Sequence, residues 1–73
     1  MNDEVKRRID DCVKGKSKTL NLGDLEIKSI PKEIKSLNWL TELNLDSNQI
    51  SKIENLPESL TVLYLRSNQI SKL

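Results

Sequence analysis

One stretch of this chain occurs twice. Residues 40–53 read LTELNLDSNQISKI and residues 60–73 read LTVLYLRSNQISKL, so Leu40 aligns with Leu60 and Asn48 with Asn68. Ten of the 14 aligned positions are identical, and six of these form the uninterrupted run SNQISK. A fixed period of about 20 residues is the signature of a repeat architecture, in which each copy is stabilised by stacking on its neighbours.

The spacing within each copy predicts a strand followed by a turn. Leu43 and Leu45 are two residues apart, so their side chains point to the same side of a strand while Asn44 points to the other. Asn48 suits the turn that follows, because its short amide can satisfy backbone groups of the loop. Ile50 then returns an apolar side chain to the interior. Stacking of such coils buries the apolar edge that a single coil leaves open.

Both copies follow the pattern L-x-x-L-x-L-x-x-N-x-I-x-x-[IL], which resembles the leucine-rich repeat family. The resemblance covers residues 17–73 and implies an α/β fold, a short solenoid with a parallel sheet of short strands. It also implies that Asn48 and Asn68 occupy the consensus asparagine ladder along the solenoid. The short period, with Leu56 and Pro57 between the copies, resembles the short bacterial type of repeat.

A first, irregular repeat precedes the two regular copies. Aligning Leu20 with Leu43 and Leu22 with Leu45 makes this repeat slightly longer and puts Leu25 where the later copies have asparagine. Departures of this kind are typical of a terminal repeat. The strands, with their leucines buried, are then predicted near residues 19–22, 42–45 and 62–65. The chain divides into an N-terminal capping helix and three repeats, of which the last is truncated: residues 1–16, 17–39, 40–59 and 60–73.

The N-terminal unit has the pattern of an amphipathic helix over residues 2–14. Asn2 or Asp3 can serve as the N-cap, and Gly15 suits the position that ends the helix. Because terminal units of solenoids need a polar-faced cap, the helix is expected to lie on the open side of the first coil. Trp39, at the end of the first repeat, is expected to pack against the convex side or under this helix. The apolar side chains on one face of the helix are Val5, Ile9, Cys12 and Val13.

Charge and composition argue against several classes of function. Twelve basic and 11 acidic side chains give a net charge of +1, which offers no general attraction to nucleic acid or to an anionic membrane. No apolar run approaches the roughly 20 residues of a membrane span, and the N-terminus has no apolar signal segment. The single cysteine, Cys12, allows no internal disulfide, which favours a reducing compartment, so the expected location is cytoplasmic.

The sequence also lacks the residues of common active sites. The chain has no histidine, and its two glycines, Gly15 and Gly23, are too far apart to form a phosphate-binding loop. With one cysteine and scattered carboxylates, no metal-ligand set is recognisable. We therefore expect no catalytic residue, no metal and no cofactor, and we expect that the chain is not an enzyme. Cys12 is either a reactive thiol or, as its place in the apolar stripe favours, a small apolar residue.

The outward positions of the three expected strands form one face of the sheet. In the leucine-rich repeat family this concave face is the usual protein-binding surface, and the resemblance implies the same here. Tyrosine and arginine, as at Tyr64 and Arg66, are enriched at binding hot spots. A plain solvated face with a weak Asp46–Arg66 pair is the alternative. The candidate partner-binding residues are Asn21, Glu42, Asn44, Asp46, Val62, Tyr64 and Arg66.

The third repeat stops at Leu73 before any return arm, and no capping helix follows it. An uncovered apolar edge strand is a template for another chain, so a homodimer through the last coil is a second hypothesis. A third hypothesis is that the chain is the N-terminal part of a longer leucine-rich repeat protein. The identity of SNQISK in both copies also fits a recent duplication or a designed sequence. The residues assigned to self-association are Leu60, Val62, Leu63, Tyr64, Leu65, Ile70 and Leu73.

Overall fold

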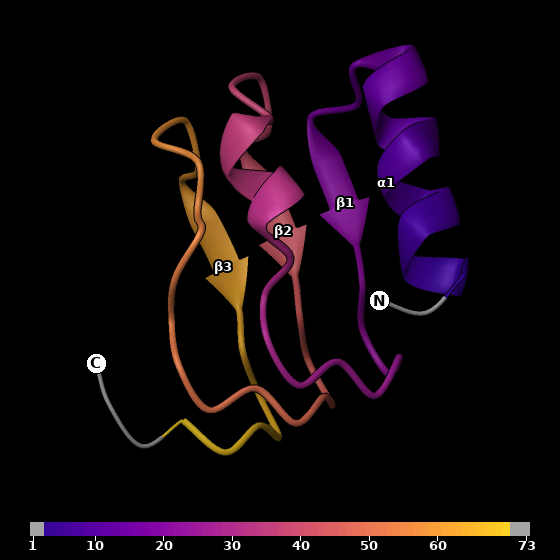
Figure 1. Cartoon of the computed structure of the whole chain (residues 1–73). Coiled ribbons are helices and arrows are strands. Elements are labelled where there is room, and N and C mark those ends of the chain that lie inside the picture. Colours follow the sequence, from indigo (N-terminus) through magenta and orange to yellow (C-terminus); the bar gives the residue numbers. More distant parts are fainter. Residues whose placement is uncertain (1–2, 71–73) are drawn as a thin grey trace.

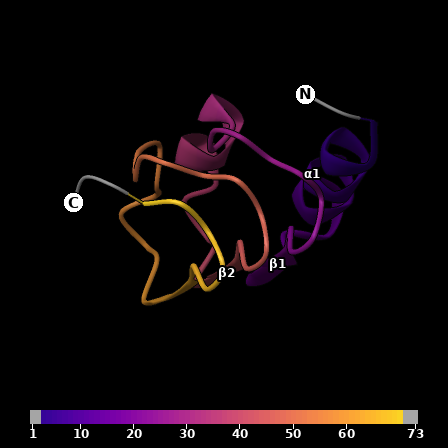
Figure 2. The same cartoon turned by 90° about the horizontal axis from the view of Figure 1, so that it is seen from below.

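The computed structural model describes residues 3–70 and contains one α-helix, one 3₁₀ helix and a sheet of three parallel strands (Figure 1). Each of the first two strands is followed by a turn and by a return arm on the side opposite the sheet, so the chain runs through successive similar coils (Figure 2). The helix lies beside the first strand, at one end of the row (Figure 1). In chain order the elements are α1 (Asp3–Gly15), β1 (Thr19–Asn21), η1 (Lys32–Ser36), β2 (Glu42–Asn44) and β3 (Val62–Tyr64).

The strands lie in the order β1-β2-β3 with the register that the sequence alignment predicts. Leu20, Leu43 and Leu63 are aligned partners, and each strand begins and ends within one residue of its predicted bounds. The pairing continues past the strands, where the N–H of Leu45 donates to the carbonyl of Tyr64 (2.8 Å). Positions that align between the repeats of the sequence therefore also lie side by side in space.

The core is a stack of leucines and isoleucines between the sheet and the return arms. The side chains of Leu43 and Leu45 are 0% exposed, as is that of Ile50 from the return side. Leu63 and Leu65, the equivalent leucines of the third coil, are only partly buried, so the prediction that all strand leucines are buried is wrong there. The reason is that, among residues 3–70, no further coil lies on the outer side of β3.

The same backbone turn follows each strand. Asp24, Ser47 and Ser67 occupy equivalent positions, and all three adopt the left-handed conformation, with φ of 57°, 58° and 56°. Left-handed backbone is unfavourable for residues with a Cβ, so other contacts must hold each turn in place. In the second and third coils these contacts come from the next residue, the asparagine of the repeat pattern.

The helix α1 packs on the first coil through an apolar stripe. Val5, Ile9 and Cys12 are at most 5% exposed, which confirms three of the four predicted positions. Val13 is 45% exposed, so its assignment to the buried stripe is wrong. It follows Cys12 by one residue, a rotation of about 100° that carries its side chain off the narrow contact stripe.

The end of α1 differs by one residue from the prediction. Lys16 has the left-handed conformation (φ 46°), and Gly15 is the last helical residue. The N–H of Ser17 donates to the carbonyl of Cys12 (3.1 Å), which is the long bond of a Schellman motif. The Lys16 ammonium lies 5.3 Å from the ring centroid of Trp39, a cation–π contact that favours lysine here. Trp39 itself is half-buried and packs against the core.

Arg8 joins α1 to the outer edge of β1. Its guanidinium donates to the carbonyl of Asn21 (2.9 Å) and to the carboxylate of Glu4 (2.7 Å). Hydrogen bonds from Arg8 and then from Arg7 hold the pKa of the Glu4 carboxyl below its ordinary value. Glu4 therefore stays ionised and keeps Arg8 in place over a main-chain acceptor at the edge of the sheet.

The two return arms differ in length and in conformation. Pro31 begins the longer arm, and η1 follows it with Ile34 and Leu37 buried. The shorter arm has no helix, and Asn55 ties it to the first coil by donating to the carbonyl of Ile30 (3.0 Å). The coils are thus joined on the return side as well as in the sheet.

Candidate functional site

The residues proposed from the sequence as partner-binding lie together on one face of the sheet, which we call the strand face. Asn21, Asn44 and Tyr64 are register partners and form one row across the three strands. Glu42 and Val62 pair in the preceding row. Val62 and Tyr64 are 38% and 43% exposed, and the others are exposed or half-buried. One partner could therefore touch all of these side chains at once.

The carboxamide oxygens of Asn21 and Asn44 each accept a hydrogen bond from the main chain two residues further on. The N–H of Gly23 donates to Asn21 Oδ1 (2.9 Å), and the N–H of Asp46 donates to Asn44 Oδ1 (2.8 Å). A Cβ at Gly23 would lie 3.2 Å from Asn21 Oδ1 and 3.3 Å from Asn44 Oδ1. A side chain at this position would therefore require the two amide oxygens to move by a few tenths of an ångström.

Asp46 and Arg66, the last two candidate residues, interact differently from the expected side-chain pair. Asp46 Oδ1 accepts a hydrogen bond from the main-chain N–H of Arg66 (2.7 Å). No ion pair joins the Arg66 guanidinium to a carboxylate of residues 3–70. The Asp46 carboxylate thus fastens the third coil to the second and leaves the exposed guanidinium to solvent.

Asn48 supports the strand face from inside the turn. Its side chain is 6% exposed. Its Nδ2 donates to the carbonyls of Leu22 and Leu45 (both 3.0 Å), and its Oδ1 accepts from the N–H groups of Leu25 (3.0 Å) and Ile27 (2.9 Å). One buried amide therefore satisfies main-chain groups of two successive coils, as expected for a ladder asparagine.

Asn68 repeats this arrangement one coil further on. Its Nδ2 donates to the carbonyls of Leu45 (2.8 Å) and Leu65 (3.2 Å), and its Oδ1 accepts from the N–H of Ile50 (2.9 Å). The asparagine ladder that the family resemblance implies is present at both positions. Because the ladder fixes the spacing of the coils, it also fixes the spacing of the side chains on the strand face.

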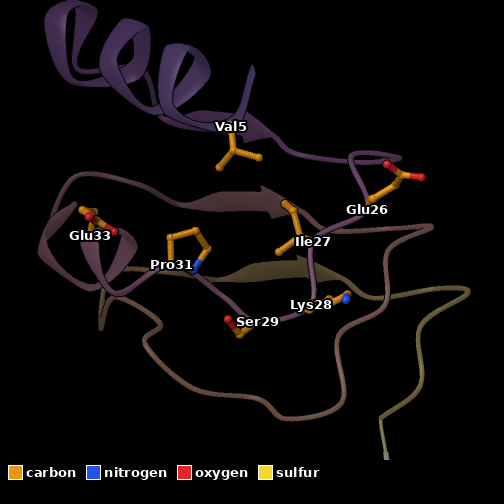
Figure 3. Close-up of a pocket in the computed structure, with 7 residues that line it drawn as sticks. All are labelled: Val5, Glu26, Ile27, Lys28, Ser29, Pro31 and Glu33. Atoms are coloured by element: carbon orange, nitrogen blue, oxygen red, sulfur yellow. The ribbon is translucent and has the colours of Figure 1, made fainter. Parts of the chain in front are cut away.

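A pocket of about 570 Å³ lies between α1 and the first return arm (Figure 3). Val5, Ile27 and Pro31 form its apolar part, and Glu33 and Glu26 stand at its opposite ends (Figure 3). None of these residues was assigned to a binding site from the sequence, because the pocket depends on how α1 packs on the first coil. Val5 and Ile27 are only 1% and 7% exposed, so the pocket offers little apolar contact area. The strand face is the stronger candidate site.

Comparison with known proteins agrees with this geometry. A family model described as Leucine Rich repeat matches residues 36–52 and 57–72, and each matched segment contains one strand and one ladder asparagine. This chain belongs to the leucine-rich repeat family. Toll-like receptor 6 from Bos taurus is 37% identical over 62 residues, which cover 82% of this chain and 8% of the receptor. The similarity therefore concerns a small part of the receptor.

Among residues 3–70, no group of three or more His, Cys, Asp or Glu side chains is placed to hold a metal ion. No helix in the same range is long and apolar enough to cross a membrane. The Cys12 thiol is free and buried, and it donates to the carbonyl of Ser17 (3.4 Å), which fits its interpretation as a packing residue.

Proposed function

We propose that this protein is a non-enzymatic interaction module that binds a protein partner through the concave strand face. Leucine-rich repeat domains generally mediate protein–protein interaction, so membership of the family supports this class of function. The observation that carries the proposal is the strand register, which puts Asn21, Asn44 and Tyr64 side by side on an accessible face. Neighbouring strands are about 4.8 Å apart, so this row spans about 10 Å, which suits a short segment of a partner.

Tyr64 and Arg66 are expected to contribute most of the binding free energy. The Tyr64 side chain is 43% exposed and offers a large ring with a polar end. The Arg66 guanidinium has no ion pair within residues 3–70, so a partner would not have to displace an existing carboxylate. Both residue types are common among binding hot spots.

The proposal is tested by selecting binders from a displayed library of protein fragments and measuring their affinity for variants. Tyr64→Ala and Arg66→Ala are each expected to weaken binding about tenfold or more. Lys28→Ala and Lys52→Ala change exposed cations on the return side and serve as controls, with affinity expected to stay unchanged. Binders that tolerate both strand-face changes would show that this face is not the site.

We also propose that α1 caps the N-terminal side of the solenoid and that the repeats are of the short bacterial type. The buried stripe of α1 and the bond from Arg8 to the carbonyl of Asn21 support the capping role. The capping unit would then comprise residues 1–16, followed by repeats at 17–39, 40–59 and 60–73. A cytoplasmic location remains part of the proposal, supported by the buried free thiol of Cys12. Cell fractionation tests the location.

Self-association through the third coil is a second candidate function. The supporting observation is a difference in burial between two register partners. Leu43 is 0% exposed, and Leu63 is only partly buried. The residues involved would be Leu60, Val62, Leu63, Tyr64, Leu65 and Ile70, while Leu73 lies outside the described residues. Further repeats of a longer protein would cover the same surface. An analysis of the full reading frame separates these two explanations.

A further inference from the structure

Two neighbouring amides on the strand face have unused donors. Asn21 and Asn44 are register partners in β1 and β2, so their side chains lie about 4.8 Å apart. Each carboxamide nitrogen carries two N–H donors. Within residues 3–70, each of these amides accepts a hydrogen bond through its oxygen, and neither nitrogen donates one. The strand face therefore presents an adjacent pair of amide donors.

The orientation of both amides is fixed. The N–H groups of Gly23 and Asp46 require acceptors, so the oxygens face them, at 2.9 and 2.8 Å. The absence of a Cβ at Gly23 leaves room for this orientation, since an added Cβ would lie 3.2 and 3.3 Å from the two oxygens. Because the oxygen end of each amide is held, the nitrogen end is preorganised for a partner, and binding loses less side-chain entropy.

The charges around the pair favour a neutral acceptor. Glu42 and Asp46 lie two residues before and after Asn44 on the same face, each about 7 Å away along the strand. They would repel an incoming carboxylate or phosphate, and Arg66 offsets only one of the two charges. A main-chain carbonyl oxygen accepts the same hydrogen bonds without a net charge. An extended peptide offers such oxygens in a row.

We propose that the Asn21–Asn44 amide pair binds main-chain carbonyl oxygens of an extended peptide segment that lies across the strands. This inference rests on the proposed function and names the chemistry that the strand face recognises. Tyr64, the third member of the row, offers its hydroxyl and exposed ring to the continuation of the same segment. The partner is thus recognised through its backbone at β1 and β2 and through its side chains at β3.

The test uses linear random peptides from a displayed library, selected on the whole 73-residue chain. Asn44→Asp keeps an oxygen that accepts from the Asp46 N–H and removes the N–H donors. The selected peptides are expected to bind this variant about tenfold more weakly, and Asn21→Asp is expected to act in the same way. Peptides that bind Asn44→Asp as tightly as the wild type overturn the proposal.

A charge control is needed because aspartate also adds a negative charge. The double variant Glu42→Gln, Asn44→Asp restores the wild-type charge of the strand face and still lacks the Asn44 donors. Its affinity is expected to be about tenfold lower than that of Glu42→Gln alone, which keeps both amides. Recovery of the wild-type affinity in the double variant would assign the effect to charge and refute the proposal.

Tyr64→Ala separates this inference from the proposed function. Peptides weakened by Tyr64→Ala but not by Asn44→Asp would leave the strand face as the binding site and overturn the role of the amides. Peptides indifferent to both changes would overturn the proposed function as well. A library that yields no peptide whose binding depends on Asn44 also counts against the inference.

Hydrogen exchange tests the donor geometry without any ligand. The side-chain NH₂ groups of Asn48 and Asn68 donate to main-chain carbonyls, so their protons are expected to exchange slowly with water. Those of Asn21 and Asn44 are expected to exchange quickly. NMR spectra of the free protein resolve the two classes. Slow exchange at Asn21 and Asn44 would mean that their donors are already engaged, and the proposal would be wrong.

Discussion

Asparagine has two different roles in this protein, and its place in the repeat decides which one it has. On the strands, Asn21 and Asn44 use only their carboxamide oxygens, each for the N–H two residues on. In the turn, Asn48 uses both ends of its amide and bonds to the backbone of two coils. The same residue type is thus a surface group in one phase of the repeat and a structural element in another.

The first prediction compares these two roles. Asn48→Ala is expected to lower the free energy of unfolding by about 2–3 kcal/mol, because it leaves main-chain groups in a buried turn without partners. Asn44→Ala is expected to cost under about 1 kcal/mol, because water can replace the one bond that its oxygen accepts. Urea unfolding measures both. Equal losses would mean that the ladder amide of Asn48 stabilises the fold no more than the strand-face amide of Asn44.

The second prediction compares equivalent leucines of two coils. Leu45 is 0% exposed, and Leu45→Ala is expected to cost about 3 kcal/mol or more as a core truncation. Leu65 is only partly buried, so Leu65→Ala is expected to cost about half as much. Thermal and urea unfolding compare the two variants. A larger loss at Leu65 would indicate that the outer side of the third coil is covered in solution.

At the scale of the elements, the strands and turns could be predicted because each depends on a local pattern. The spacing of Leu43 and Leu45 defines a strand, and the repeat places Leu63 and Leu65 in the same phase. The position of the ladder asparagines follows from the same alignment. The candidate site could be predicted as well, because it consists of the side chains that alternate with the buried leucines along these strands.

Other features depend on packing between elements and could not be predicted. Sequence favours Gly15 for the end of α1, yet Lys16 takes the left-handed position, where its ammonium meets Trp39 from a distant part of the chain. The closeness of Gly23 to the amides of two strands depends on the strand register and on the turn together. The pocket beside α1 depends on the docking of the helix. No local pattern reports such contacts.

The third prediction tests the docking of α1 with two matched substitutions. Ile9→Ser is expected to cost about 2–4 kcal/mol, because Ile9 is 5% exposed in the stripe that contacts the first coil. Val13→Ser is expected to cost under about 1 kcal/mol, because Val13 is 45% exposed on the same helix. Thermal unfolding followed by the emission of Trp39, the only tryptophan, measures both. Similar small losses would show that α1 is an appendage and not a cap.

At the scale of the whole molecule, the two edges of the sheet differ, because one is covered and the other is open. On the β1 side, α1 buries its apolar stripe on the first coil, and Arg8 covers the carbonyl of Asn21. On the β3 side, nothing among residues 3–70 continues the sheet. Main-chain groups point alternately to the two sides of a strand, and the N–H of Val62 bonds inward to Thr41. The main-chain groups of Leu63 therefore point outward, at an open edge.

The last prediction concerns this edge. An exposed edge strand with an apolar flank is a template for a second strand, and in a symmetric dimer the two copies of β3 would pair antiparallel. The wild-type chain is then expected to sediment as a dimer at high micromolar concentration. Leu63→Pro removes the outward N–H, and the inward bond of Val62 stays intact, so this variant is expected to sediment as a monomer.

Asn44→Ala is the matched control for assembly, because Asn44 lies on the strand face in β2, one strand away from the open edge of β3. It is expected to weaken partner binding and to leave the dimer in place. A dimer lost in Asn44→Ala but kept in Leu63→Pro would place self-association on the strand face. Sedimentation of the wild type as a monomer throughout the concentration series would exclude self-association through β3 and leave partner binding as the function of the strand face.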